Sequence, residues 1–272
     1  MIEFKNATFT YPETEKPVFE NLTLTLPDGI VSCIGQNGTG KSTLLLLASG
    51  RLLPDTGDVF IDGVDTKTFK TEEDRAKYAA YIYQNMEFET EEPIGDLLTY
   101  VFENGFHTTK DLIFVDQLVE VFELENFLSK KTQQLSKGEL QRTILAFSLL
   151  YGSTNIFMDE PIFALEDYQK KQALEFLTSY AKKDSYSLYY SLHELDLSEK
   201  YSETIVLFSK KTEPRVGPAK ELFQKEIIEE AYEVPFDMLK KRESLFRDSL
   251  IQLDTMRQKE APPEEEQPED YV

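Results

Sequence analysis

The sequence has a single cysteine, Cys33, and no tryptophan among its 272 residues. One cysteine cannot form a disulfide within the chain, which agrees with a reducing compartment. Because Cys33 stands in the apolar run IVSCIG, we expect it to be a small buried side chain rather than a reactive thiol.

Long apolar runs are also missing. No uninterrupted run approaches the roughly 18 residues that a membrane-spanning helix needs, so we do not expect the chain to cross a bilayer. The first residues, MIEFKNATFTYP, lack the basic and apolar regions of a secretory signal. A cytoplasmic location is therefore expected.

Basic residues are scarce, because 29 lysines and arginines stand against 50 aspartates and glutamates, for a formal net charge of −21. Such a surface repels nucleic acid and anionic lipid headgroups, so we expect no nucleic-acid partner. Net charge does not exclude docking onto a membrane protein, because docking depends on a local patch. The length fits one large α/β domain.

Strand and helix patterns alternate along most of the chain. Residues 2–11 and 18–26 alternate apolar and polar side chains, as half-buried antiparallel strands do. Residues 86–134 instead repeat apolar residues at helical spacing, which predicts an inserted helical subdomain. Further strands are predicted at 30–35, 59–63, 78–84, 155–160 and 187–193, and further helices at 42–50, 139–152 and 167–183. Strands that alternate with helices imply a mostly parallel sheet.

The strongest local signal is the segment GQNGTGKS at 35–42, between a predicted strand and a predicted helix. Its glycines let several N–H groups and the helix N-terminus point at one anion, while Lys41 adds a positive charge and Ser42 a hydroxyl for Mg²⁺. We predict a nucleotide site here, with these candidate ligands: Asn37, Gly38, Thr39, Gly40, Lys41, Ser42 and Thr43.

A second signal is an apolar strand that ends in two acids, Asp159 and Glu160. Asp159 can position Mg²⁺ and Glu160 can polarise an attacking water. Two adjacent acids after a strand are, by themselves, usually a solvated turn. Their occurrence together with the phosphate-binding segment favours the functional interpretation.

Three more elements follow in order: Gln84 after YIY, the segment LSKGE at 135–139 at the start of a helix, and His193 after SLYYSL. With the two signals above, they make the chain resemble the ATP-binding cassette (ABC) family over roughly residues 2–210. The resemblance implies an α/β P-loop NTPase core with a mostly parallel sheet, an N-terminal antiparallel β subdomain and an inserted helical subdomain. We expect one ATPase domain over residues 1–250 and an acidic, disordered tail over 251–272.

The resemblance also implies roles for residues in an ATP and Mg²⁺ site. Tyr11 would stack on the adenine, although a tyrosine there can also simply cover the edge of the core. Gln84 would join Ser42 and Asp159 around Mg²⁺. Catalysis would depend on Lys41 at the phosphates, Glu160 as general base and His193 at the γ-phosphate.

In this family Ser136 and Gly138 complete the ATP site of a second ABC subunit, so two ATP molecules lie between two subunits. Whether that second subunit is an identical or a different chain stays open. Three positions depart from the family pattern: Lys137 and Glu139 replace a glycine and a glutamine of LSGGQ, and Glu166 stands where an aspartate is usual.

The favoured function is an ATP-binding and hydrolysing subunit of an ABC transporter, peripheral on the inner face of the cell membrane, that drives a separate transmembrane permease subunit. The helical subdomain would contact this partner near Gln84. The acidic segment 87–92 is either part of that contact or a solvated turn. The alternative is a soluble, non-transport ABC ATPase that acts on a macromolecular complex. A regulatory cassette that only binds ATP is disfavoured, because the catalytic residues are present.

Cargo and direction of transport stay open. A cassette on a chain of its own resembles the arrangement usual in prokaryotic importers. The opening IEFKNATFTYP resembles cobalt-type and energy-coupling cassettes, whereas EEAYEVPFDML at 229–239 resembles the ends of metal-chelate and vitamin B12 importer cassettes.

Overall fold

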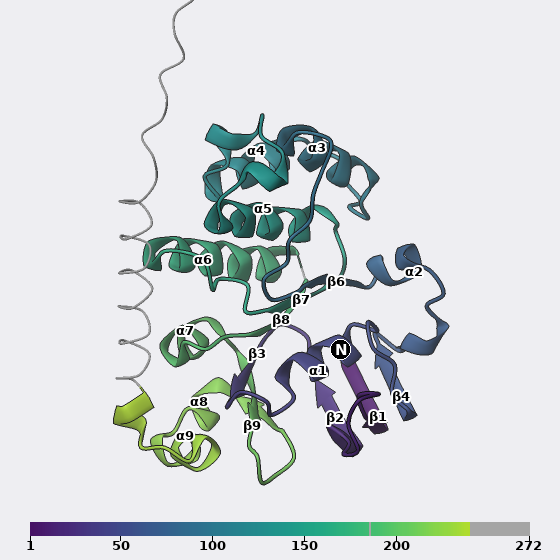
Figure 1. Ribbon diagram of the computed structural model, residues 1–272, viewed down its shortest axis with the longest axis vertical. Helices are drawn as coiled ribbons and strands as arrows, with labels where there is room; N and C mark the ends of the chain where they lie inside the picture. The colour runs from purple at the N-terminus through teal and green to yellow at the C-terminus, as the bar shows by residue number, and fades with distance from the viewer. Residues whose placement is uncertain (185, 240–272) are drawn as a thin grey trace, which may run out of the picture. The chain divides into compact units, whose positions relative to one another are not determined.

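The computed structural model of the protein describes residues 1–184 and 186–239 (Figure 1). The chain divides into two units, Met1–Tyr232 and Glu233–Val272. The first unit carries both sheets and all the predicted site residues. The acidic tail that the sequence predicts at 251–272, with its boundary after residue 250, lies outside the described residues.

The smaller sheet is antiparallel and has the strand order β2-β1-β4-β5. Its strands are β1 (Ile2–Phe9), β2 (Phe19–Leu26), β4 (Thr56–Ile61) and β5 (Val64–Asp65). Each neighbouring pair is antiparallel, and both β1 and β2 bury one set of apolar side chains while exposing polar ones. The predicted antiparallel β subdomain is therefore confirmed.

The larger sheet has the order β10-β9-β3-β8-β7-β6 and carries the site. Its strands are β3 (Ile30–Gly35), β6 (Ala79–Ile82), β7 (Asn155–Asp159), β8 (Ser187–Ser191), β9 (Thr204–Phe208) and β10 (Arg215–Pro218). The pair β9–β10 is antiparallel and the other four pairs are parallel, which confirms the prediction. The sequence patterns did not predict β9 and β10.

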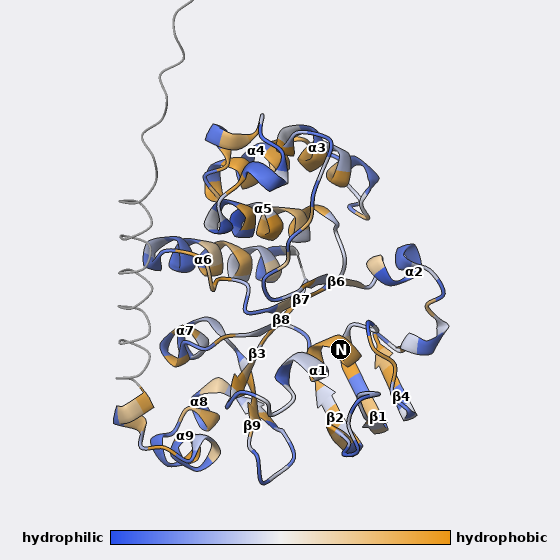
Figure 2. Ribbon diagram, in the orientation of Figure 1, coloured by the Kyte–Doolittle hydropathy of each residue, from blue (hydrophilic) through white to orange (hydrophobic). Residues whose placement is uncertain are grey.

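The central strands separate two hydrophobic cores, because alternate side chains of a strand point to opposite faces. In β7, Ile156 and Met158 belong to the core under the helices α3 to α6, whereas Phe157 belongs to the core shared with α1 and the smaller sheet. Figure 1 shows the two layers on either side of the sheet, and Figure 2 shows hydrophobic residues along the central strands and α1. Cys33 is fully buried, as expected.

Nine α-helices occur in the described part of the chain. Those that the sequence patterns predicted are α1 (Lys41–Ala48), α3 (Ile94–Asn104), α4 (Ile113–Val121), α5 (Lys137–Leu150) and α6 (Asp167–Asp184). The sequence patterns did not predict the other four, which are α2 (Glu72–Ala76), α7 (Leu195–Tyr201), α8 (Ala219–Leu222) and α9 (Lys225–Tyr232). The segment 86–134 contains α3 and α4. None of the described helices has the length and apolar character needed to span a bilayer.

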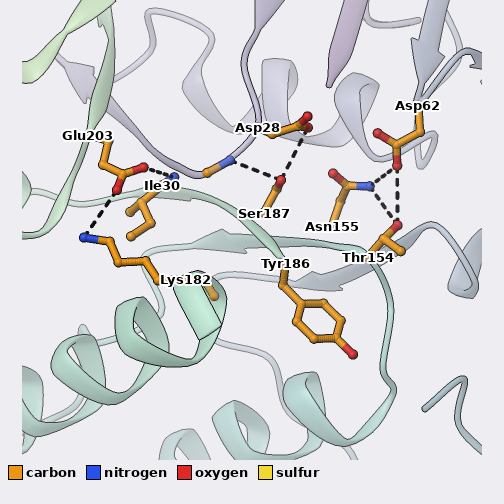
Figure 3. A pocket seen from close by; sticks show the side chains of 11 residues that line it. Asp28, Ile30, Asp62, Thr154, Asn155, Lys182, Tyr186, Ser187 and Glu203 are labelled. Carbon is orange, nitrogen blue, oxygen red and sulfur yellow. Dashed lines mark hydrogen bonds and ion pairs between the residues drawn. The ribbon is translucent and has the colours of Figure 1, made fainter. Parts of the chain in front are cut away.

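A cavity of about 440 Å³ opens at the edge of the larger sheet where the parallel strands begin (Figure 3). Its lining includes Ile30, Asn155 and Ser187, which are the first residues of β3, β7 and β8. The phosphate-binding segment begins at Gly35, the last residue of β3. The cavity therefore lies at the opposite edge of the sheet from the predicted nucleotide site.

Candidate nucleotide-binding and catalytic site

The phosphate-binding loop connects the end of β3 at Gly35 to the start of α1 at Lys41. Gly40 has a φ of 101°, in the left-handed region, and an added Cβ there would lie 2.9 Å from the Phe19 ring. Thr39 Oγ1 donates to the carbonyl of Gln36 at 2.8 Å, which closes the loop on itself. Because the loop ends at a helix N-terminus, its N–H groups are available to an anion.

Lys41 is only 7% exposed, and its ammonium donates to the carbonyls of Gly35 and Gln36, each at 2.9 Å. Burial lowers the pKa of Lys41, while the charges of Asp159 and Glu160 act in the opposite direction. Because β3, β8 and β7 are parallel neighbours, the end of β7 at Asp159 lies at the same edge of the sheet as the end of β3 at Gly35. The structure thus brings together the two strongest signals of the sequence.

The acids follow β7 at the same edge of the sheet. Asp159, the last residue of β7, is 7% exposed and is paired in register with Ser191, the last residue of β8. Ser191 Oγ donates to Asp159 Oδ1 at 2.5 Å and accepts from the backbone N–H of Glu160 at 3.0 Å. Glu160 has a φ of 52°, a left-handed conformation that is unfavourable for a side chain of this kind.

The Glu160 carboxylate is held between two other predicted residues. Gln84 Nε2 donates to one of its oxygens at 2.8 Å, and His193 Nε2 lies 2.5 Å from the other. The Glu160 side chain is 13% exposed and that of His193 is 39% exposed. A carboxylate in this arrangement is oriented and still reachable from solvent, as a general base requires.

The oxygen atoms available for Mg²⁺ fit an ion that is bound by one protein carboxylate together with phosphate oxygens. Ser191 occupies one oxygen of Asp159, which leaves the second oxygen for a metal ion. Ser42 is exposed beside Lys41, and the amide nitrogen of Gln84 bonds to Glu160, so its oxygen remains for a ligand role. Within the described residues no cluster of three histidine, cysteine or acidic side chains could hold a metal by itself. Mg²⁺ that also binds phosphate oxygens needs no such cluster.

Tyr11 lies beside the phosphate-binding loop. Its hydroxyl is 3.1 Å from Thr43 Oγ1, and its ring packs edge-on against Phe9 with centroids 4.9 Å apart. The ring is half-buried. Stacking of Tyr11 on adenine stays a prediction.

The segment LSKGE starts α5 and caps it. Ser136 Oγ accepts from the backbone N–H of Glu139 at 3.3 Å, and the Glu139 carboxylate accepts from the backbone N–H of Ser136 at 2.7 Å. This reciprocal capping box explains why glutamate can replace the family's glutamine, since either side chain accepts the bond. Ser136 and Lys137 are exposed. Gly138 lies close to the backbone of Ala164, because an added Cβ would be 3.2 Å from the Ala164 carbonyl oxygen.

Two residues of the site were not found from the sequence. Ser191 is two positions before His193, and only the register of β7 on β8 reveals that it meets Asp159. Tyr232 ends α9, and its hydroxyl accepts from the backbone N–H of Gly35. Both contacts depend on pairing between distant segments, for which a single sequence gives no signal.

Comparison with known proteins identifies the family. A family profile described as ABC transporter matches residues 19–163, somewhat more than half of the chain. The petrobactin import ATP-binding protein YclP of Bacillus subtilis (strain 168) is 28% identical over 238 residues, which cover 86% of this chain and 93% of the relative. The energy-coupling factor transporter ATP-binding protein EcfA1 of Lactobacillus acidophilus is 26% identical over 242 residues, 86% of this chain and 85% of the relative.

Solved structures confirm the fold. An ATP-binding subunit of an ABC transporter superposes with a TM-score of 0.73 at 24% identity and covers 89% of this chain and 98% of its own. A dimeric ATP-binding cassette bound to ADP and Pi superposes with a TM-score of 0.70 at 23% identity. The match covers 80% of this chain and 99% of the cassette's own. The chain belongs to the ABC transporter family, as one of its ATP-binding subunits with ATPase activity.

Proposed function

We propose that this chain binds ATP with Mg²⁺ at the loop 35–42 and hydrolyses it with Glu160 as general base. The observation that carries the proposal is the position of the Glu160 carboxylate, which is held by Gln84 and His193 one residue after the buried Asp159. These two contacts orient the carboxylate beside the loop that would bind the phosphates.

Each residue has a physical task in this proposal. The loop amides and the Lys41 ammonium bind the β- and γ-phosphates. Asp159, Ser42 and the Gln84 oxygen hold Mg²⁺, which neutralises charge on the phosphate oxygens when it is bound.

Once the phosphates are in place, Glu160 takes the proton from the attacking water. The His193 imidazole lies beside that carboxylate and contacts the γ-phosphate of the bound ATP.

We further propose that two subunits enclose two ATP molecules, with Ser136 and Gly138 of each subunit completing the site of the other. The exposed serine hydroxyl at the N-terminus of α5 supports this, because a helix N-terminus attracts a phosphate and Ser136 is not turned into its own core. The partner can be a second copy or a different ABC chain.

Sedimentation of a Glu160→Gln variant tests the pairing. With MgATP the variant should shift from monomer to dimer, because it binds ATP and does not consume it. Ser136→Arg in the same background should still bind MgATP but remain monomeric, since the larger side chain blocks the facing site. A monomeric Glu160→Gln protein with bound MgATP would contradict pairing between identical chains. A dimer that persists with Ser136→Arg would contradict the role of Ser136 in completing the facing ATP site.

The same proposal includes a membrane partner. A mostly apolar groove of about 390 Å³ lies between β6, the segment after it and helices α3 and α5, and its lining includes Tyr83, Met86, Phe88, Val101 and Phe147. We propose that a short helix of a transmembrane permease packs there and that the chain works peripherally on the cytoplasmic face of the membrane. The relatives named for petrobactin import and energy-coupling transport support this role.

Membrane association tests the partner and separates the transporter from a soluble ABC ATPase. Tyr83→Glu and Phe88→Glu should reduce the fraction of the chain that sediments with membranes of cells that naturally contain it. Tyr100→Glu is the control, because Tyr100 is 63% exposed and is not part of the groove lining. Equal sedimentation of all variants, or none for the unaltered chain, would favour a soluble role.

A further inference from the structure

The segment EEAYEVPFDML has no place in the function proposed above, yet its tyrosine touches the nucleotide site. Tyr232, the last residue of α9, accepts a hydrogen bond at its hydroxyl from the backbone N–H of Gly35, at 2.8 Å. The side-chain amide of Gln36 donates to the Tyr232 carbonyl. Two consecutive residues at the start of the phosphate-binding loop are thus tied to one residue 197 positions after Gly35.

The Gly35 amide needs such a partner. Gly35 is paired with Phe208 of β9, but on the β8 side the pairing of β3 ends two residues earlier, at Cys33 and Ser191. Gly35 is buried, and an added Cβ would lie 2.6 Å from the Phe208 carbonyl. A buried N–H without an acceptor is costly, and here the Tyr232 hydroxyl supplies the acceptor.

The helix that carries Tyr232 has a buried face. Ile228 and Ala231, on the same helix, are 0% and 4% exposed, so α9 is held by its own buried face. Tyr232 is half-buried, with its hydroxyl at the loop. The hydrogen bond that Gly35 donates to Tyr232 therefore ties the start of the loop to a helix with a buried face.

The bonds of Lys41 link the contact between Tyr232 and the loop to phosphate binding. Its ammonium donates to the carbonyls of Gly35 and Gln36, the same two residues that Tyr232 holds. These two bonds use two of its three N–H donors, which leaves the third for a phosphate oxygen. The Gly35 N–H and the Gln36 side-chain amide bond to Tyr232, so the Lys41 ammonium and Tyr232 hold the start of the loop through different atoms of the same two residues.

We propose that Tyr232 is a positioning residue that latches the start of the phosphate-binding loop and thereby raises the affinity for nucleoside di- and triphosphates. The inference rests on the proposed nucleotide site at this loop. Because the latch acts on the loop and not on Glu160, it affects binding of ATP and ADP to a similar degree and leaves the chemical step unchanged.

Calorimetric titration of the full chain with MgATP and with MgADP tests this proposal. We expect Tyr232→Phe to raise both dissociation constants about five- to tenfold, with the turnover rate at saturating MgATP within about twofold of the unaltered protein, as for loss of one hydrogen bond. Gln36→Ala removes the other tie and should weaken both nucleotides in the same direction. Tyr189→Phe is the matched control, because it loses a similar bond from a tyrosine hydroxyl to the Pro27 carbonyl, at 3.1 Å, in β8.

The outcomes separate the latch from the nucleotide site. If the unaltered chain binds MgATP and Tyr232→Phe and Gln36→Ala bind it equally well, the latch is overturned and the nucleotide site stands. If Tyr189→Phe weakens binding as much as Tyr232→Phe, the effect is general destabilisation and the latch is also overturned. If the unaltered chain binds neither nucleotide, both the site and the latch are wrong.

Discussion

The hydroxyl of Ser191 allows the sharpest prediction about the acid cluster. In Ser191→Ala the Glu160 amide loses its acceptor and Asp159 loses a short bond from a hydroxyl. A bond to a charged group contributes about 1.5–3 kcal/mol, and a buried donor without a partner costs about 1–3 kcal/mol. Because one hydroxyl serves both groups, the terms overlap, and we expect the free energy of unfolding to fall by about 2–4 kcal/mol.

Activity should fall further than stability alone explains. The unfavourable left-handed backbone of Glu160 is held by the lost bond, so its carboxylate will leave its place between Gln84 and His193. We expect the turnover rate at saturating MgATP to drop about 10- to 100-fold, or about 1.4–2.7 kcal/mol of transition-state stabilisation. More Mg²⁺ should be needed for half-maximal rate, since Asp159 is released as well.

Ser32→Ala is the control for this experiment. Ser32 is as fully buried as Ser191 and lies in the same sheet, but its hydroxyl donates only to Ser198 Oγ, at 3.3 Å. The control should lose about 1 kcal/mol of stability and keep its turnover rate. The reasoning is refuted if Ser191→Ala is destabilised at assay temperature no more than the control and hydrolyses ATP with the same rate and the same Mg²⁺ dependence.

Two further predictions concern α5 and β3. Glu139→Ala should lower the free energy of unfolding by about 1 kcal/mol at pH 7, because the capping box is lost, while Glu139→Gln should keep most of it. Although burial alone would raise the pKa of Glu139, hydrogen bonds from Ser136 lower it below its ordinary 4.5, so its ionised form stabilises the fold above about pH 4.5 and this stability is lost as the pH falls through the lowered pKa. Denaturation measured from pH 3 to 7 should therefore show a steeper loss in acid for the unaltered chain than for Glu139→Gln; parallel profiles would contradict the assignment. Burial raises the pKa of the Cys33 thiol to about 12, so the native protein should not react with a disulfide reagent at pH 8, whereas the unfolded chain should react fully; rapid reaction of the folded protein would show that β3 opens.

Periodicity predicted the regular elements that frame the site. Strict alternation identified β1 and β2, and the short apolar runs before Gly35 and Asp159 became β3 and β7. The order of the motifs then placed their catalytic side chains at the ends of parallel strands. The resemblance to the ABC family, and not the periodicity, is what assigned Gln84 and His193 to the same site as Glu160 before the fold was known.

The parts that the sequence did not predict depend on contacts between residues that are far apart in the sequence. Residues 204–208, TIVLF, form the inner strand β9, yet a five-residue apolar run is ambiguous between strand and buried helix. Ser191 acquires its role only through the register of β8 on β7. Tyr232 meets the phosphate-binding loop because α9 packs beside it, and no local pattern marks that approach.

The central claim is that Glu160 activates the water that hydrolyses ATP. Single-turnover hydrolysis by a Glu160→Gln variant tests it most directly, because the substitution keeps the size and the hydrogen-bonding shape of the side chain but removes the base. The account predicts a rate at least about 100-fold lower than that of the unaltered chain, with the dissociation constant for MgATP within about threefold. Hydrolysis by Glu160→Gln at the rate of the unaltered chain would contradict it.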